Sequence, residues 1–183
     1  TGDVKAKVSG SFFSVGNGGM SVTAEDASSL LADTSRISAA GLSLDTNLEE
    51  EGVQSPAFAL DAVSAENNVT RSVEASIKTS TVDAAAGTIT VKADKNTKIK
   101  AEAKADAQAS LPLDYPEGFN VGAGGVYVFN QIVGTTSAFV EQSNLKTTTS
   151  GDIVVSAADN AEIEALAQAG GKATGSGSAA TAG

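Results

Sequence analysis

Hydrophobic and polar residues alternate along several stretches of this chain. Three of these stretches directly follow glycine-containing turns, at residues 20–24, 89–93 and, less regularly, 153–157. In a β-strand, successive side chains point to opposite faces, so strict alternation places one face in a core and the other in solvent. The pattern therefore predicts a β-strand at each of these three places.

The stretch 99–109 contains conflicting signals. Its Ala, Glu, Lys, Asp and Gln residues are good or tolerated helix formers. Its apolar residues, however, stand at every second position: Ile99, Ala101, Ala103, Ala105, Ala107 and Ala109. A helix with this spacing would have no apolar stripe and would carry charge all around its surface. We therefore expect a strand here, because the spacing outweighs the composition.

The whole pattern repeats along the chain. Gly18 recurs as Gly87, at an offset of 69, and Ala75 recurs as Ala138, at an offset of 63. After one inserted residue the offset becomes 64, as for Ile89 and Ile153. Internal repeats of this kind indicate a solenoid, in which each unit buries its apolar face against its neighbours.

A shorter echo lies inside each repeat. Ser11 is echoed by Ser35, at an offset of 24, and Gly18 by Gly41, at an offset of 23. The echo predicts about three rungs in each long repeat, each a short coil of strands and glycine turns. The expected fold is all-β, a right-handed parallel β-helix (solenoid). Leucine-rich repeats have similar lengths, but their Leu and Asn ladder is missing here.

We expect residues 1–183 to form a single β-helical segment of a longer repeat array, because the repeats begin and end in mid-unit. Two segments break the pattern, at about 47–57 and 110–120, and they contain all three prolines. Both are interpreted as loops inserted between rungs. Such loops often carry recognition. A solvated insertion is the simpler interpretation of each, because added loop length costs little free energy. The candidate recognition residues in the second loop are Leu113, Asp114, Tyr115, Glu117 and Phe119.

Charge and hydropathy exclude several partners. The formal net charge is −10, and binding to nucleic acid needs clustered Lys and Arg to replace counterions. No apolar run approaches the roughly 20 residues of a membrane helix. We therefore expect neither nucleic-acid binding nor membrane insertion.

The composition also limits catalysis. The chain has no His and no Cys, so the usual nucleophilic triads and His/Cys zinc sites cannot form. Paired carboxylates could still cleave glycosides, and the candidates are Asp83, Asp94, Lys92 and Lys95. These positions change between copies, since Lys95 is replaced by Asp159 in the third. We expect no enzymatic activity.

No cofactor is expected either. Calcium is the ion that the acidic composition favours most, but the chain contains no calcium-loop motif, and the run Glu49–Glu51 lacks ligand spacing. One recurring polar position has a structural explanation instead. Ser11, Ser80 and Ser143 stand at equivalent places, and we expect each hydroxyl to cap backbone groups at a turn.

The third copy contains a recognisable series of motifs. A small-residue run, GAGGVYVFN at 122–130, is followed by TxAxV at 136–140, SxL at 143–145, GDIxVxA at 151–157 and AxIxA at 161–165. This series resembles the repeats of giant bacterial surface proteins, the filamentous-haemagglutinin-like adhesins and leukotoxin-type autotransporters. The resemblance implies export to the cell surface or the medium and a β-helical stalk that serves adhesion or filament assembly. It also implies neighbouring copies, and a surface glycan or protein receptor, as partners.

Two functional classes follow from these observations. The first is a structural stalk or scaffold whose rungs stack on adjacent copies of the repeat. The second is a carbohydrate-binding or polysaccharide-degrading β-helix module that uses the 110–120 loop.

Overall fold

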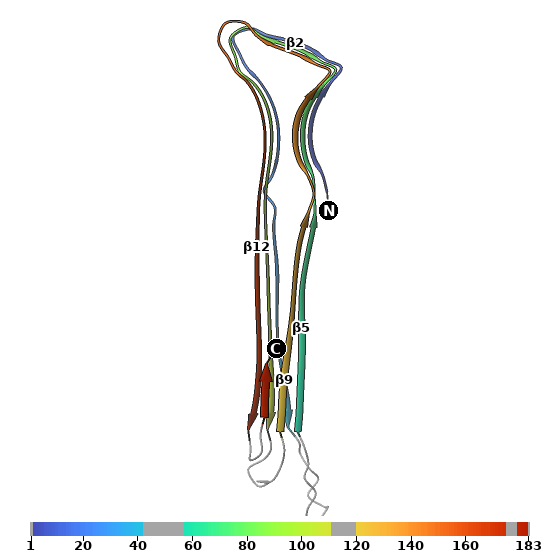
Figure 1. Cartoon of the computed structure of the whole chain (residues 1–183), viewed down its shortest axis with the longest axis vertical. Helices are drawn as coiled ribbons and strands as arrows, with labels where there is room; N and C mark the ends of the chain where they lie inside the picture. The colour runs from blue at the N-terminus through green and yellow to red at the C-terminus, as the bar shows by residue number, and fades with distance from the viewer. Residues whose placement is uncertain (1, 42–56, 111–119, 175–178, 183) are drawn as a thin grey trace, which may run out of the picture. The chain divides into compact units, whose positions relative to one another are not determined.

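The structure is a computed structural model, and it describes residues 2–41, 57–110, 120–174 and 179–182. Within these ranges the chain forms thirteen strands and no helix (Figure 1). The predicted all-β class is therefore confirmed. No helix in the described part of the chain could cross a membrane.

The strands follow the repeat. The first copy contains β1 (Val4–Ser9), β2 (Phe12–Val15), β3 (Met20–Asp26) and β4 (Ser29–Gly41). The next four strands are β5 (Ala57–Thr70), β6 (Val73–Lys78), β7 (Thr81–Ala84) and β8 (Ile89–Ser110). They are followed by β9 (Asn120–Val133), β10 (Thr136–Glu141), β11 (Asn144–Thr147), β12 (Ile153–Thr174) and β13 (Ala179–Ala182).

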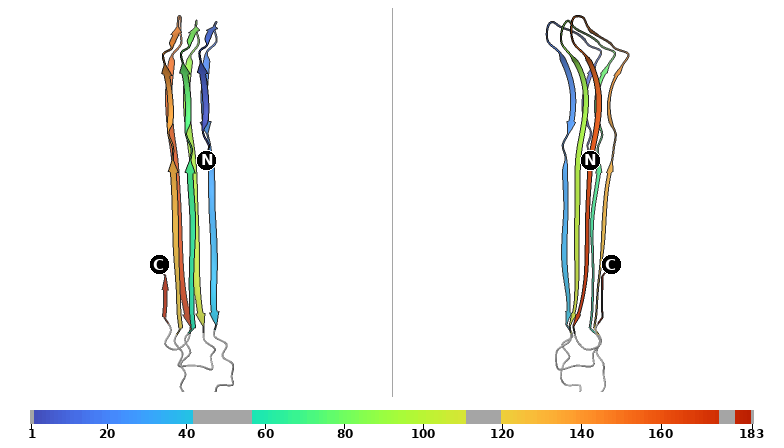
Figure 2. Two further views of the ribbon diagram at one scale, coloured as in Figure 1. Left: turned by 90° about the vertical axis from the view of Figure 1, so that its right-hand side faces the viewer. Right: turned by 60° about the vertical axis from the view of Figure 1, so that its left-hand side comes forward.

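Equivalent strands of successive copies lie side by side in sheets (Figure 2). In the described residues the orders are β1-β6-β10, β2-β7-β11, β3-β8-β12 and β5-β9-β13, and β4 also pairs with β8. The recorded pairs are parallel. Each sheet therefore grows by one strand for every copy of the repeat.

The register of the sheets equals the repeat offset. Val73 of β6 lies beside Val4 on one side and Thr136 on the other. Likewise, Met20 of β3 lies beside Ile89 of β8. In this register most inward-facing apolar residues lie next to apolar residues, as Ala75 does between Ala6 and Ala138.

The predicted division of each repeat into three rungs is wrong. Hydrogen-bonded strands are separated by a whole repeat, because Val4 pairs with Val73, and Val73 pairs with Thr136. The internal echo, in contrast, covered only a few positions near Ser11 and Gly18. A register of one whole repeat matches nearly every inward-facing residue, so it buries more apolar surface than a shorter coil would.

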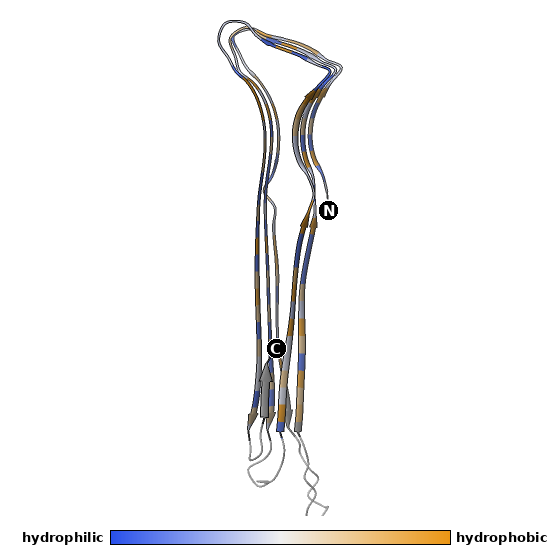
Figure 3. Cartoon of the chain, viewed as in Figure 1, coloured by the Kyte–Doolittle hydropathy of each residue, from blue (hydrophilic) through white to orange (hydrophobic). Residues whose placement is uncertain are grey.

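Strand β8 resolves the conflict between composition and spacing. Its residues alternate between buried and more exposed along all 22 positions from Ile89 to Ser110. The six apolar residues of the stretch 99–109 are all buried. Hydrophobic and hydrophilic residues are interleaved along the strands in the same way (Figure 3). The strand prediction is confirmed.

The chain forms two compact units, and each has its own core. The first unit comprises residues 1–30, 68–99 and 131–163, and the second comprises residues 31–67, 100–130 and 164–183. Isoleucine and valine dominate the core of the first unit, including Ile77, Ile89 and Val91. Alanine dominates the core of the second unit, for example Ala101, Ala103 and Ala107.

Candidate functional site: stacking contacts between repeats

The features that recur from copy to copy are contacts between neighbouring repeats. A serine stands at the same corner in each copy. The backbone N–H of Ser11 donates to Ser80 Oγ at 3.2 Å, and that of Ser80 donates to Ser143 Oγ at 3.1 Å. The Ser80 hydroxyl in turn donates to the Lys78 carbonyl at 2.7 Å. The Ser11 and Ser143 hydroxyls likewise donate to the carbonyls of Ser9 and Glu141. The prediction that these hydroxyls cap backbone groups is confirmed, and those of Ser80 and Ser143 also join two copies.

The residue before each serine has an unusual backbone conformation. Gly10, Thr79 and Gln142 have φ angles of 60°, 49° and 47°. This left-handed region is open to glycine but costs other residues about 1–2 kcal/mol each. The same corner is therefore built in all three copies, even where the side chain opposes it.

A second corner brings backbones so close together that only glycine fits. A Cβ atom added to Gly87 would lie 2.2 Å from the carbonyl carbon and oxygen of Gly18, its counterpart in the first copy. A Cβ on Gly151 would lie 2.4 Å from the oxygen of Gly87. The recurring glycine at this position permits the copies to stack at this spacing.

An asparagine pair links copies inside the second unit. Asn67 Nδ2 donates to Asn130 Oδ1 and to the Lys100 carbonyl, both at 3.0 Å. Asn130 Nδ2 donates to the Glu164 carbonyl at 2.8 Å. Each amide thus bridges one sheet to another, and the pair joins neighbouring copies. This role was not predicted from the sequence, although the recurrence of Asn at an offset of 63 was the available signal.

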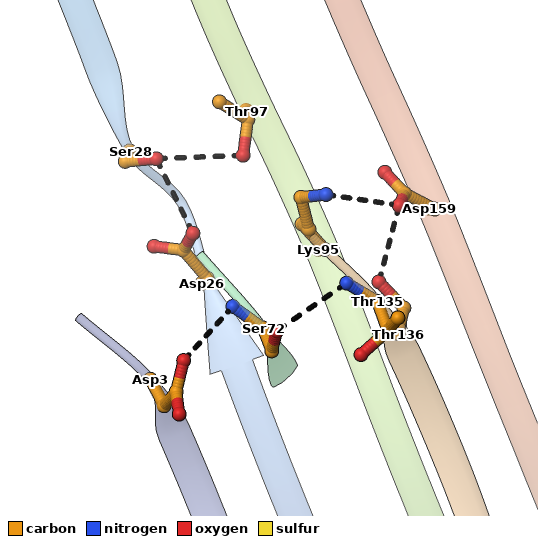
Figure 4. Close-up of polar contacts among 9 residues, drawn as sticks. All are labelled: Asp3, Asp26, Ser28, Ser72, Lys95, Thr97, Thr135, Thr136 and Asp159. Atoms are coloured by element: carbon orange, nitrogen blue, oxygen red, sulfur yellow. Dashed lines mark hydrogen bonds and ion pairs between the residues drawn. The ribbon is translucent and has the colours of Figure 1, made fainter. Parts of the chain in front are cut away.

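Two charged residues of the first unit, Asp26 and Lys95, are buried, and Figure 4 shows polar contacts that they make. Lys95 is 2% exposed, and its Nζ donates to Asp159 Oδ2 at 3.1 Å. The Thr136 hydroxyl donates to the same oxygen at 3.2 Å. The neighbour of Lys95 in the first copy is Asp26. Asp26 Oδ1 accepts a hydrogen bond from Arg71 Nη1 at 2.6 Å. A buried charge needs such a partner because leaving water is costly.

Further ion pairs join the middle copy to the third on the outer surface. Lys98 Nζ lies 2.7 Å from Glu162 Oε2, and in the second unit Lys100 Nζ lies 2.9 Å from Glu164 Oε1. The hydrogen bond from Lys98 lowers the pKa of Glu162 below its ordinary value, and Glu162 raises the pKa of Lys98 in turn. Both groups are exposed, so water and salt weaken the pair.

The carboxylates and lysines considered for glycoside cleavage do not form an acid pair. Lys92 and Asp94 form an ion pair with each other, on the face of β8 opposite to the buried Lys95. Asp83 lies on a different strand, β7. Among the residues that the structure describes, no group of three acidic side chains is placed to hold a metal ion.

The predicted recognition residues Leu113, Asp114, Tyr115, Glu117 and Phe119 lie outside the described residues. The same holds for most of the two predicted loops at 47–57 and 110–120. Only their boundary residues are described: Ala57 begins β5, Ser110 ends β8 and Asn120 begins β9.

Comparison with known proteins provides no relative from which a function could be transferred. No family model, curated protein or solved structure matches the chain. The stacking contacts are therefore the basis for a functional interpretation.

Proposed function

We propose that this chain is a structural segment of an extracellular bacterial repeat protein, a stalk or scaffold that serves adhesion or filament assembly. In this proposal each repeat makes one rung of a right-handed parallel β-helical solenoid. The observation that carries the proposal is the register of one repeat between neighbouring strands, as in Met20 beside Ile89. A stack of this kind can be lengthened by adding copies, and its function is mechanical.

Exposure at the third copy supports this role. Ile153, Val155 and Ile163 are 47%, 45% and 53% exposed. Their counterparts in the middle copy, which has a copy on each side, are Ile89, Val91 and Ile99, and these are at most 2% exposed. A further rung would bury the same apolar surface and would pair the free backbone edge of β12.

The test adds one rung. A second copy of residues 63–125 is fused after Gly183, which continues the register of β13 on β9. We expect hydrogen exchange, followed by mass spectrometry, to slow at the amides of 153–157 because the edge becomes paired. The matched control carries the same added residues in scrambled order and should leave exchange unchanged. Equal exchange in the two extended chains would refute the stacking role.

One observation favours a second candidate function, the binding of carbohydrate. Tyr127 and Phe129 of β9 are exposed, and their rings stack with centroids 6.4 Å apart and an angle of 4° between the planes. Sugar rings pack their C–H faces on such aromatic surfaces. Tyr127 also lines a shallow hollow with Ala62, Val63 and Ser64.

A glycan array tests this second candidate. Binding by the native chain that is lost in Tyr127→Ala and retained in Tyr115→Ala would support a platform on β9. The reverse result would place recognition in the 110–120 loop, and an array without any binding would reject the carbohydrate function.

A further inference from the structure

Among the described residues, the ion pairs between the middle and third copies all have the same polarity. In the first unit, Lys78 pairs with Glu141 at 3.2 Å, Lys95 with Asp159 at 3.1 Å and Lys98 with Glu162 at 2.7 Å. In every case the cation belongs to the middle copy and the anion to the third. The third copy therefore meets its neighbour through an acidic edge on β10 and β12.

The first copy lacks the complementary charges. Lys78 lies beside Ser9 in the first copy, and Lys95 lies beside Asp26. Ser29 is the first-copy residue that corresponds to Lys98 at the repeat offset. If a third-copy edge met a first-copy edge in the same register, Asp159 would face Asp26, and Glu141 and Glu162 would face serines. Like charges placed directly opposite each other destabilise a pair of strands.

The acidic edge retains acceptor capacity on its open side. β10 and β12 are edge strands in the described sheets. Each recorded lysine contact uses one carboxylate oxygen, namely Glu141 Oε2, Asp159 Oδ2 and Glu162 Oε2. An ionised carboxylate has two oxygens with about four acceptor positions. These three side chains can thus accept hydrogen bonds from cations on both sides of the strand.

We propose that the β10/β12 edge selects, in parallel register, a rung that carries lysines at the positions of Lys78, Lys95 and Lys98. Its partner is therefore a repeat of the middle type, and not the first-copy edge of another molecule. This inference rests on the proposed stacking function and adds a rule for the order of the repeats: an acidic rung is followed by a lysine-bearing rung.

The test compares two extended chains. Both carry residues 63–125 fused after Gly183. One keeps the native lysines, and the other has Lys78→Ser, Lys95→Asp and Lys98→Ser in the added rung only, which are the residues that the first copy carries. We expect the amides of 153–163 to exchange at least about tenfold more slowly beside the native rung. This difference should shrink in 1 M salt, where the screening length is about 3 Å.

A third extended chain separates charge from packing. Lys98 is largely exposed in the native chain, so Lys98→Ser alone in the added rung leaves the core intact. It should give intermediate protection. Equal protection by the native and the triple-variant rungs would overturn the charge rule while leaving the stacking function standing. If neither rung protects β12, the stacking function itself fails, and with it the rule.

Discussion

The two compact units share one alternating pattern but build different cores. In the first unit, isoleucine and valine fill the interior, and Ile77, Ile89 and Val91 are fully buried. In the second unit, alanines such as Ala101 and Ala107 occupy the equivalent inward positions. There a Cβ on Gly122 would lie 2.7 Å from the Lys172 oxygen and 2.9 Å from the Ala107 oxygen. The second core is therefore too thin for larger side chains.

This difference shows that strands with the same two-residue alternation can be stabilised by two kinds of core. The core of the first unit, called the wide core below, gains stability mainly from buried aliphatic surface, at about 25 cal/mol per Å². The alanine core of the second unit, called the thin core below, buries less surface per residue. It relies more on the close approach of backbones and on the hydrogen bond between the Asn67 and Asn130 amides. The two cores should therefore respond differently to substitution.

The largest effect is expected in the wide core. Val91→Asp would place a charge without a partner in a fully buried position. We expect the free energy of unfolding to fall by about 3–5 kcal/mol, the range for an uncompensated buried charge. Urea denaturation measures the loss. Thr90→Asp, on the opposite face of β8, should change stability by about 0.5 kcal/mol or less. Similar midpoints for the two variants would disprove the inward assignment of Val91.

In the thin core of the second unit, added side-chain volume should cost somewhat less stability than a buried charge costs in the first unit. Gly122→Val forces backbone atoms apart, so we expect a loss of about 3 kcal/mol, at the upper end for overpacking. The control is Gly125→Ala, whose Cβ would approach only the Asp61 oxygen, at 4.0 Å. The same urea measurement applies. A tolerated Gly122→Val would mean that the thin core can widen.

The amide pair should contribute less than either core. Asn67→Ala removes the donors to Asn130 Oδ1 and the Lys100 carbonyl. The expected loss is about 1–3 kcal/mol, the cost of leaving buried polar groups unsatisfied. Thermal unfolding compares this variant with Asn68→Ala, at the exposed neighbouring position. If both variants melt alike, the pair does not stabilise the second unit.

Relief of corner strain should stabilise the first unit slightly. Thr79 has a φ of 49°, and Thr79→Gly removes the Cβ that opposes this conformation. We expect a gain of about 1 kcal/mol, because the strain of about 1–2 kcal/mol is partly offset by the greater freedom of glycine in the unfolded chain. Thermal unfolding would contradict the strain argument if the midpoint fell.

The smallest effect is the pH response of the outer ion pairs. Lys98 lowers the pKa of Glu162, so the pair contributes stability above the ordinary Glu pKa of about 4.3. This contribution disappears as the pH falls through the lowered value. Glu162→Gln should therefore lose slightly less stability than the native chain between pH 6 and pH 3. A steeper loss in the variant, measured by urea titration at each pH, would contradict the sign.

Local pattern was sufficient to predict the strands over 20–24, 89–93, 99–109 and 153–157, which lie in β3, β8 and β12. The spacing of Ile99 to Ala109 placed β8 correctly against its helix-like composition, because a two-residue period reflects only which face each side chain takes. The serine caps were equally predictable, because Ser80 and its equivalents bond to groups near them in the sequence or one repeat away.

The length of a rung and the partners of the buried polar groups depended on tertiary structure. Whether Ser11 lies beside Ser35 or beside Ser80 depends on how many residues the chain uses before it comes back alongside itself. The short echo predicted Ser35, whereas Ser11 contacts Ser80. Likewise, nothing local indicated that Asn67 would reach the Lys100 carbonyl, or that Lys95 would be buried against Asp159. Such pairings are made across sheets and between copies, so they are defined only when distant segments are brought into contact.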